Sequence, residues 1–407
     1  MRVIIAGYGI GGAALALALQ TFDIDCVVLE QARKLEEVGA GVQLSPNGLG
    51  VLDRLGVLEQ LRKVAFEPHE LLYRDWQTGE VLMHNPLMPQ INERFGAPYF
   101  HAHRADLLDV LRSPLESHRV SLGRKITSVE QRGEKVYAYL ADGTTEEGDI
   151  LIGADGIHSL VRNQIFQADA PQSSGCLAWR GLVDAKAAAH LKIAPSAHLW
   201  MGPGYSVVIY YVSGGSKINW ICIGSSPSAR AESWSATTTT EEVLGIYHGW
   251  HSEVRDLIAL TEKPFVTALY DRLPLKRWVK GRIALMGDAA HAMLPYHAQG
   301  AVQSLEDAWV LAKLLDISKG ADMPGTLERY AELRMDRTAR IQAQSRVAEH
   351  RFHLSDPIEV AERNDRMRKY DQQFKGAFLP QQEWLFGYNA DLAATGNDTQ
   401  WRDLRPW

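Results

Sequence analysis

A glycine-rich turn near the start of the chain constrains the fold more than any other feature. Residues 2–6 form a short apolar run rich in β-branched side chains, and four glycines follow between positions 7 and 12. Strong helix formers fill residues 13–20, and residues 25–30 again have the pattern of a buried strand. This order predicts a βαβ unit, whose crossover helix requires the two strands to be parallel. Further along, residues 50–64 have the pattern of one short amphipathic helix.

The spacing of Gly7, Gly9 and Gly12 is typical of a turn that binds the pyrophosphate of a dinucleotide. The glycines permit a tight turn, let the backbone approach the phosphates, and let the following helix present its positive N-terminus to them. Glu30 ends the second strand, where its carboxylate can accept hydrogen bonds from ribose hydroxyls and would repel a 2′-phosphate. The motif therefore favours an adenine dinucleotide with a free 2′-hydroxyl, and it leaves FAD and NAD both open.

The composition limits the kinds of protein that this chain can be. Of its 407 residues, 46% are hydrophobic and 23% are charged, which is the balance of a globular protein with a large core. The net charge of −6 argues against a nucleic-acid partner, and no apolar run reaches the ~20 residues of a bilayer span. Three cysteines are too few for a disulfide framework or a cysteine-based zinc site. We therefore expect no metal, no membrane span and a reducing, cytoplasmic location.

Two further motifs place an acidic residue at the end of a predicted strand. Asp155 and Gly156 follow one apolar run, and Asp288 follows another. Asp288 could accept a hydrogen bond from a ribose or ribitol hydroxyl. A helix begins near Gly300 and Ala301, and its N-terminus could stabilise an anionic oxygen. On pattern alone, each motif is equally an ordinary strand–turn–helix connection.

In this order and at these distances, the three motifs resemble those of the single-component FAD-dependent aromatic hydroxylases, the group A flavoprotein monooxygenases. The resemblance covers nearly the whole chain and implies a mixed α/β (α+β) fold like that of 4-hydroxybenzoate hydroxylase. Such a fold has a Rossmann-like FAD-binding domain, an inserted antiparallel-sheet substrate domain and C-terminal helices. The expected FAD-binding domain comprises residues 1–70, 100–172 and 270–345, the substrate domain residues 71–99 and 173–269, and the C-terminal helical segment residues 346–407.

The resemblance also assigns cofactor contacts to individual residues. The glycine-rich turn and Glu30 would hold the ADP half of FAD. Asp155 would contribute to FAD and nicotinamide binding, and Asp288 would contact the ribityl chain. The full set of expected cofactor residues is Gly7, Gly9, Gly12, Glu30, Arg104, Ile126, Asp155, Asp288, Gly300 and Ala301.

Within the family, the sequence is most similar to the salicylate hydroxylase and 3-hydroxybenzoate 6-hydroxylase types. Tyr210 matches a tyrosine that contacts the substrate there, and Tyr211 would face the other side of the same strand. Ser206 stands where the 3-hydroxybenzoate enzymes have a histidine, and Pro295 stands where they have a glutamine. The residues expected to contact the substrate are Tyr210, Pro295 and Gln43, and those expected to act in catalysis are Tyr210 and His297.

The implied activity is hydroxylation of a hydroxylated aromatic acid or N-heteroaromatic with O2 and NADH or NADPH, through a flavin C4a-hydroperoxide. A group near the substrate must accept the proton of its hydroxyl, and histidine is suited to this at neutral pH. Two alternatives remain open. One is a related flavoenzyme that reduces, oxidises or halogenates its substrate, and the other is a dinucleotide-binding protein without turnover. The family analogy also suggests a homodimer.

Overall fold

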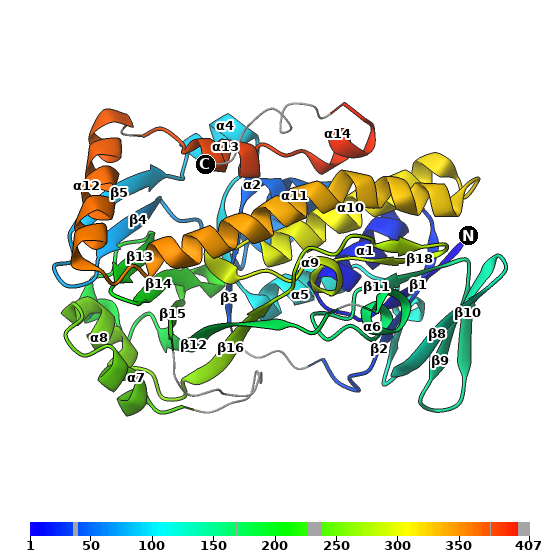
Figure 1. Cartoon of the computed structure of the whole chain (residues 1–407), viewed down its shortest axis with the longest axis horizontal. Helices are drawn as coiled ribbons and strands as arrows, with labels where there is room; N and C mark the ends of the chain where they lie inside the picture. The colour runs from blue at the N-terminus through cyan, green and yellow to red at the C-terminus, as the bar shows by residue number, and fades with distance from the viewer. Residues whose placement is uncertain (36–39, 168, 226–237, 375, 398–407) are drawn as a thin grey trace.

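The structure of the protein is a computed structural model, in which two large β-sheets lie towards opposite ends of an elongated molecule (Figure 1). The long helix α11 (Met323–Phe352) runs obliquely between the two ends. The residues that the structure describes are 1–35, 40–167, 169–225, 238–374 and 376–397.

The first sheet contains the predicted βαβ unit. Its strands, in spatial order, are β17 (Val279–Lys280), β18 (Ile283–Leu285), β11 (Ile150–Gly153), β1 (Arg2–Ala6), β2 (Asp25–Glu30) and β7 (Val120–Leu122). All neighbours are parallel except β17 and β18. Helix α1 (Ile10–Thr21) connects β1 to β2, so the predicted unit and its parallel strands are confirmed. Val3, Ile4 and Ile5 of β1 are fully buried, which explains why the strand is apolar on both faces.

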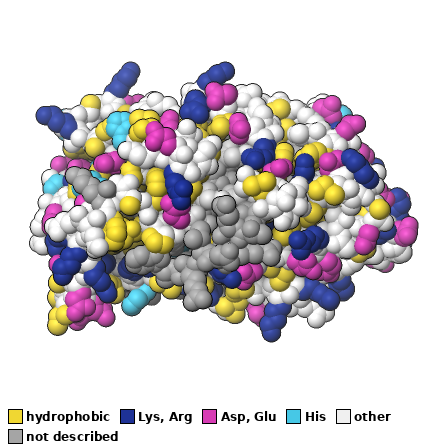
Figure 2. Space-filling model, turned by 90° about the horizontal axis from the view of Figure 1, so that it is seen from above, with side chains coloured by type: hydrophobic (Ala, Val, Ile, Leu, Met, Phe, Trp, Pro, Cys, Tyr) yellow, Lys and Arg dark blue, Asp and Glu magenta, His cyan; other side chains and the backbone are white. Residues whose placement is uncertain are grey.

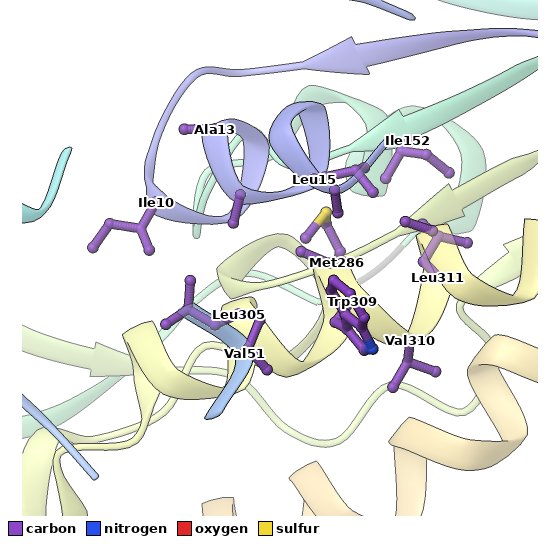
Figure 3. Close-up of a cluster of buried hydrophobic side chains, with 14 of the residues drawn as sticks. Ile10, Ala13, Leu15, Val51, Ile152, Met286, Leu305, Trp309, Val310 and Leu311 are labelled. Carbon is purple, nitrogen blue, oxygen red and sulfur yellow. The ribbon is translucent and has the colours of Figure 1, made fainter. Parts of the chain in front are cut away.

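Helix α1 packs against the long helix α10 (Gly300–Ser318), and small residues allow their close approach. A Cβ atom on Gly11 would lie only 3.3 Å from side-chain atoms of Met286 and Ser304. Figure 3 shows the apolar cluster between the two helices, with Leu15 of α1 and Trp309 of α10 among its members. This core fixes the N-terminus of α10 relative to the glycine-rich turn that precedes α1.

The second sheet is mostly antiparallel. Its strands, in spatial order, are β16 (Phe265–Asp271), β12 (Gln172–Asp184), β15 (Lys217–Ser225), β14 (Tyr205–Val212), β13 (Ala197–Gly202), β4 (Glu70–Asp75) and β5 (Val81–Pro86). Only β13 and β4 are parallel among these neighbours. Helices α7 (Thr240–Ile246) and α8 (Ser252–Ala259) contribute to a separate core on one face of this sheet. The other face carries Tyr210.

Smaller elements complete the described fold. Two small sheets are formed by β10 (Thr145–Gly148), β9 (Lys135–Leu140) and β8 (Ile126–Arg132), and by β3 (Gly41–Leu44) with β6 (Phe100–His103). The remaining α-helices are α2 (Pro46–Arg54), α3 (Leu58–Arg62), α4 (Gln90–Phe95), α5 (Arg104–Arg112), α6 (Leu160–Phe166), α9 (Asp288–His291), α12 (Pro357–Phe374), α13 (Pro380–Phe386) and α14 (Ala390–Ala394). The 3₁₀ turns are η1 (Ser117–Arg119), η2 (Ala189–Leu191), η3 (Ser213–Gly215) and η4 (Pro295–His297).

The single helix predicted over residues 50–64 is wrong, because the structure has the two short helices α2 and α3 there. Gly56 lies between them with φ = 73°, a left-handed conformation that ends the first helix. Within the described chain, no helix is both long and apolar enough to cross a membrane. On the face seen from above, basic and acidic side chains are interspersed rather than separated by sign (Figure 2).

Candidate active site

The glycine-rich turn has the geometry of a phosphate cradle. Gly7 has φ = 102°, and a Cβ atom there would lie 2.6 Å from the carbonyl oxygen of Ala154. A Cβ atom on Gly12 would lie 2.0 Å from the carbonyl oxygen of Gly7, so only glycine fits at either position. Beside Gly9 the described structure has no heavy atom within 4 Å of such a Cβ position. The turn is therefore closed on the protein side and open at Gly9, where a ligand can approach the backbone.

The carboxylate of Glu30 hydrogen-bonds to the backbone of this turn. Its Oε2 accepts a hydrogen bond from the backbone N–H of Tyr8 at 2.9 Å, and its Oε1 accepts one from Ala32 at 2.8 Å. A carboxylate has about four acceptor positions, so these bonds leave capacity for ribose hydroxyls. Arg112 donates to the carbonyl oxygen of Tyr8 at 2.5 Å and lies over the Tyr8 ring. The backbone of Tyr8, within the turn, is thus held by an acidic side chain at its N–H and by a basic one at its carbonyl.

Ile126 and Arg104 begin two different elements, β8 and α5. The backbone N–H of Arg124 donates to the carbonyl oxygen of Glu30 at 2.8 Å, which places the start of β8, and hence Ile126, near the end of β2. Arg104 begins α5, and its backbone N–H donates to Ala40 at 2.9 Å. Both residues are partly exposed.

Asp155 lies next to the glycine-rich turn, because the carbonyl of the preceding Ala154 faces Gly7. Its Oδ2 accepts hydrogen bonds from the backbone N–H groups of Leu160, at 2.8 Å, and Val161, at 3.2 Å. Its Oδ1 is buried without a hydrogen-bond partner among the described residues, and burial raises the pKa of the carboxyl group. An unpaired buried oxygen of this kind is suited to a hydroxyl or N–H donor of a ligand.

Asp288 and the N-terminus of α10 face one another. Gly287, with φ = 57°, lies just after the end of β18, and Asp288 follows it. The side chain of Asp288 is exposed. The nearest heavy atom to a Cβ position on Gly300 is Oδ1 of Asp288, 3.9 Å away. The open glycine turn, the unpaired oxygen of Asp155 and the exposed Asp288 therefore fit the diphosphate and polyhydroxyl chain of an adenine dinucleotide.

A buried ionic network joins α10 to α11. Arg334 donates to Glu306 Oε2 at 2.5 Å and to Asp307 Oδ1 at 2.8 Å, and Arg337 donates to Glu306 at 2.8 and 2.9 Å. Asp307 Oδ2 lies 2.6 Å from Nε2 of His291. These side chains are at most 1% exposed. Burial alone would raise the pKa of Asp307, but the neighbouring His291 and Arg334 hold it at about 2.

The network extends to the C-terminal helices. Arg337 also donates to the backbone carbonyl of Leu385 at 2.8 Å, and its guanidinium lies over the rings of Trp384 and Tyr388. On the other side, Asn47 donates to Glu306 at 2.6 Å. Sequence reasoning missed this network. The signal that could have revealed it is the pair of acidic residues within the otherwise apolar stripe of the helix that begins near Gly300.

Tyr210 is buried where the second sheet meets β3. Its ring lies 4.6 Å from that of His101, and its hydroxyl would be 2.6 Å from a Cβ atom on Gly41. The backbone N–H of Gly41 donates to Oδ1 of Asn219 at 2.9 Å, and Asn219 is the cross-strand partner of Tyr210. Burial raises the pKa of Tyr210, so its hydroxyl is a hydrogen-bond donor at neutral pH. Tyr211 lies on the opposite face, where its hydroxyl donates to Ile193.

The other predicted substrate residues lie on two different elements. Gln43 is on β3, and its Oε1 accepts a hydrogen bond from the hydroxyl of Tyr99 at 2.8 Å. Pro295 and His297 begin and end η4, where Pro295 is exposed. Nε2 of His297 lies 3.0 Å from Nε2 of Gln381 on α13, and burial lowers the pKa of this histidine to about 4. At neutral pH, His297 therefore accepts a hydrogen bond from Gln381.

The fold and this cradle define a dinucleotide-binding protein with a Rossmann-like domain. Residues 1–345 match the model of the FAD binding domain family, so the chain belongs to that family. It is an FAD-dependent aromatic monooxygenase with NAD(P)H as reductant, and the predicted family, fold class and cofactor are confirmed. In the described residues, no group of three histidine, cysteine or acidic side chains is placed to hold a metal ion.

Similarity to known proteins extends over almost the whole chain. It is 37% identical over 392 residues to the 3-amino-4-hydroxybenzoate 2-monooxygenase of Streptomyces cremeus, with 96% of each chain covered. It is 36% identical to the 3-hydroxybenzoate 6-hydroxylase of Polaromonas naphthalenivorans, again with 96% of each covered. The solved substrate complex of a salicylate hydroxylase superimposes with a TM-score of 0.82 at 28% identity and covers 97% of both chains.

Proposed function

We propose that the protein hydroxylates a monocyclic benzoate that carries a ring hydroxyl group, with O2 and NADH or NADPH as co-substrates. The observation that carries this proposal is the chemistry of the sheet face around Tyr210. The buried polar side chains there include Tyr210, its cross-strand partner Asn219, and Arg180 on β12. These are a hydroxyl, an amide and a cation, which together match a ring hydroxyl and a carboxylate.

Arg180 supplies the positive charge on this face. It is the cross-strand partner of Ile221, two residues along β15 from Asn219, so its side chain projects to the same side as Tyr210. It donates a hydrogen bond to Oγ1 of Thr267, and burial lowers its pKa to about 10, which keeps it charged at pH 7. Bringing a substrate carboxylate to this face offsets part of the cost of burying that charge.

The names of the relatives agree with this class of substrate. The Streptomyces cremeus and Polaromonas naphthalenivorans proteins are named for benzoates that carry a hydroxyl group. FAD, when bound, supplies the redox and oxygen-transfer chemistry. The chain holds it through Gly9, Glu30, Asp155 and Asp288, while Tyr210 donates a hydrogen bond to the substrate oxygen and orients the ring.

The test is a substrate panel with the FAD-loaded protein. NADH and O2 consumption and product masses are measured with 3-amino-4-hydroxybenzoate, 3-hydroxybenzoate, salicylate and 6-hydroxynicotinate. We expect at least one hydroxybenzoate to accelerate NADH oxidation and to gain one oxygen atom. Oxygenation of 6-hydroxynicotinate alone would contradict the benzoate proposal, and so would NADH oxidation that no member of the panel accelerates.

A further inference from the structure

A pocket lies on the outer part of the second sheet. It has a volume of about 470 Å³ and is formed where β4 meets β5 and the segment that leads into β13. Figure 1 shows β4 and β5 at the end of the molecule opposite the first sheet. Small-molecule sites have volumes of ~300–1,000 Å³, so this pocket is large enough for a ligand. Within the described structure, its lining includes none of the residues assigned above to the cofactor or the substrate.

Three residues from neighbouring strands form a row along one wall of the pocket. Ala197 of β13 is the register partner of Leu71 of β4, so Ser196, one residue earlier, stands beside Glu70. Glu70 is in turn the register partner of Pro86 on β5. Ser196, Glu70 and Pro86 all line the pocket. The row therefore presents a hydroxyl and a carboxylate side by side, next to an apolar ring.

The polar groups of this row lack partners within the protein. Ser196 is only 4% exposed, and its hydroxyl has no hydrogen-bond partner among the described residues. Nearly all buried polar groups in proteins are hydrogen-bonded, so an unpaired hydroxyl that lines a pocket indicates a partner from outside the chain. The half-buried carboxylate of Glu70 likewise has no hydrogen bond or ion pair with any described residue. Both groups can therefore accept a hydrogen bond from a ligand.

The rest of the lining indicates the chemistry of that ligand. The described lining contains one carboxylate, from Glu70, and no lysine or arginine. The imidazole of His69 and the amide of Gln90 complete its polar part, and Leu72 and Met88 contribute apolar walls. A carboxylate without a basic neighbour favours a cation and disfavours carboxylates and phosphates. The apolar walls favour a ligand with a hydrocarbon body.

We propose that this pocket binds a small primary amine in its protonated form, with a hydrocarbon body the size of a cyclohexyl ring. The ammonium group has three donors, and it donates to the carboxylate of Glu70 and to the unpaired hydroxyl of Ser196. The hydrocarbon body packs against Leu72 and Met88. Binding of the amine needs no aromatic substrate, so the site is independent of the proposed function.

The pocket lies behind the strand pair that packs against Tyr210. Leu71 and Ala197 are sequence neighbours of pocket residues, so their side chains point to the opposite face of the sheet. There Ala197 belongs to a buried cluster with Tyr210, and Leu71 packs against that cluster. An amine in the pocket would therefore contact, from the other side, the two strands that support the tyrosine expected to contact the substrate.

The test compares a charged ligand with an uncharged one of the same shape. The probe is cyclohexylamine, which is protonated at pH 7 because alkylamines have pKa values of about 10. Isothermal titration calorimetry measures its dissociation constant for the FAD-loaded protein, and that of cyclohexanol. We expect the alcohol to bind at least threefold more weakly than the amine, because it cannot pair with the Glu70 carboxylate.

Variants of the lining locate the site. Glu70→Gln and Ser196→Ala each remove one partner of the ammonium group, and each should weaken amine binding at least threefold. Glu262→Gln, at an exposed carboxylate outside the pocket, is the matched control and should equal the wild type. Met88→Lys, at an exposed position of the lining, brings a tethered ammonium to the pocket and should abolish binding without changing the core. Three results would each overturn the proposal and leave the proposed function intact: no binding to the wild type, equal binding to Glu70→Gln and Met88→Lys, or equal affinity for the alcohol.

Discussion

Nε2 of His291 lies 2.6 Å from Oδ2 of Asp307, and this contact joins the short helix that starts at Asp288 to the long helix α10. The same Asp307 oxygen accepts the backbone N–H of Gly287 at 2.9 Å. The buried Asp307 carboxylate holds the chain on either side of Asp288, through the backbone of Gly287 and the side chain of His291. The position of Asp288, a predicted cofactor contact, therefore depends on Asp307, a fully buried residue of α10.

Replacing Asp307 with Asn should destabilise the protein by about 3–5 kcal/mol, because it leaves Arg334 buried with reduced compensation. Urea denaturation followed by far-UV circular dichroism measures the change. Asp336→Asn, at an exposed pair with Arg340 on α11, is the control and should cost less than about 1 kcal/mol. Similar losses of unfolding free energy in both variants would show that the buried network stabilises the fold no more than an exposed ion pair does.

The same carboxylate predicts how stability depends on pH. The pKa of Asp307 is about 2 in the folded protein and about 4 in an unfolded chain, so the folded state binds fewer protons in this range. Its contribution of ~2 kcal/mol is present above pH 4 and is lost as the pH falls from about 4 to about 2. The difference in unfolding free energy between the wild type and Asp307→Asn should shrink over that range. A difference that stays constant down to pH 2 would contradict the assignment.

Alanine substitutions at two glycines of the turn should have opposite effects on the stability of the apoprotein. Gly12→Ala places a Cβ atom 2.0 Å from the Gly7 carbonyl oxygen, so it should destabilise the fold and abolish FAD binding. Gly9→Ala meets no described atom within 4 Å and has an ordinary φ of −72°, so the apoprotein should be as stable as the wild type. Its FAD affinity should fall at least tenfold, because the methyl group enters the space of the pyrophosphate. Thermal unfolding of the apoprotein and FAD fluorescence quenching separate the two effects.

Asp288→Ala should release FAD while leaving the fold intact, since the side chain is exposed and begins a helix of only four residues. Losing one or two hydrogen bonds to a ribityl chain predicts a loss in affinity of about 1–3 kcal/mol. Equilibrium dialysis against FAD measures it. Asp316→Ala, at an exposed ion pair with Lys319, is the control, and an equal loss in both variants would argue against a cofactor contact.

Tyr210→Phe should slow hydroxylation at least tenfold and change FAD affinity less than twofold, because it removes only the hydroxyl that is expected to contact the substrate. Rapid-reaction kinetics of the reduced, substrate-bound protein measure the hydroxylation step. Tyr211→Phe is the matched control, since that hydroxyl donates to Ile193 on the opposite face. If both variants hydroxylate normally, His297 becomes the better candidate for the catalytic group.

The sequence predicted those parts of the fold whose conformation depends on residues close together in the chain. The strand–turn–helix at Gly7 could be read directly, because Gly12 can only be glycine when the helix begins so close to the turn. The break at Gly56 was missed because a single left-handed residue leaves the apolar spacing around it almost unchanged. The buried network was missed because its members come from α10, α11 and the C-terminal helices, which only tertiary packing brings together.

The same distinction applies to the candidate site. Tyr210 lies on a strand whose alternation already placed it opposite Tyr211, and the structure has the two side chains on opposite faces. The proximity of His353 to Ser206 joins positions 147 residues apart, across two different elements. No periodicity in the sequence relates such residues, since their contact depends on the length and direction of α11.

The bond from Arg337 to the carbonyl of Leu385 has a practical consequence for engineering. A protein shortened before α13 would lose backbone acceptors from the interior rather than a surface appendage, because Arg337 would lose its bond to Leu385 and its contact with the Trp384 ring. Purification tags, fusion partners and immobilisation linkers that pull on this end of the chain would therefore act on α11, which carries Arg337.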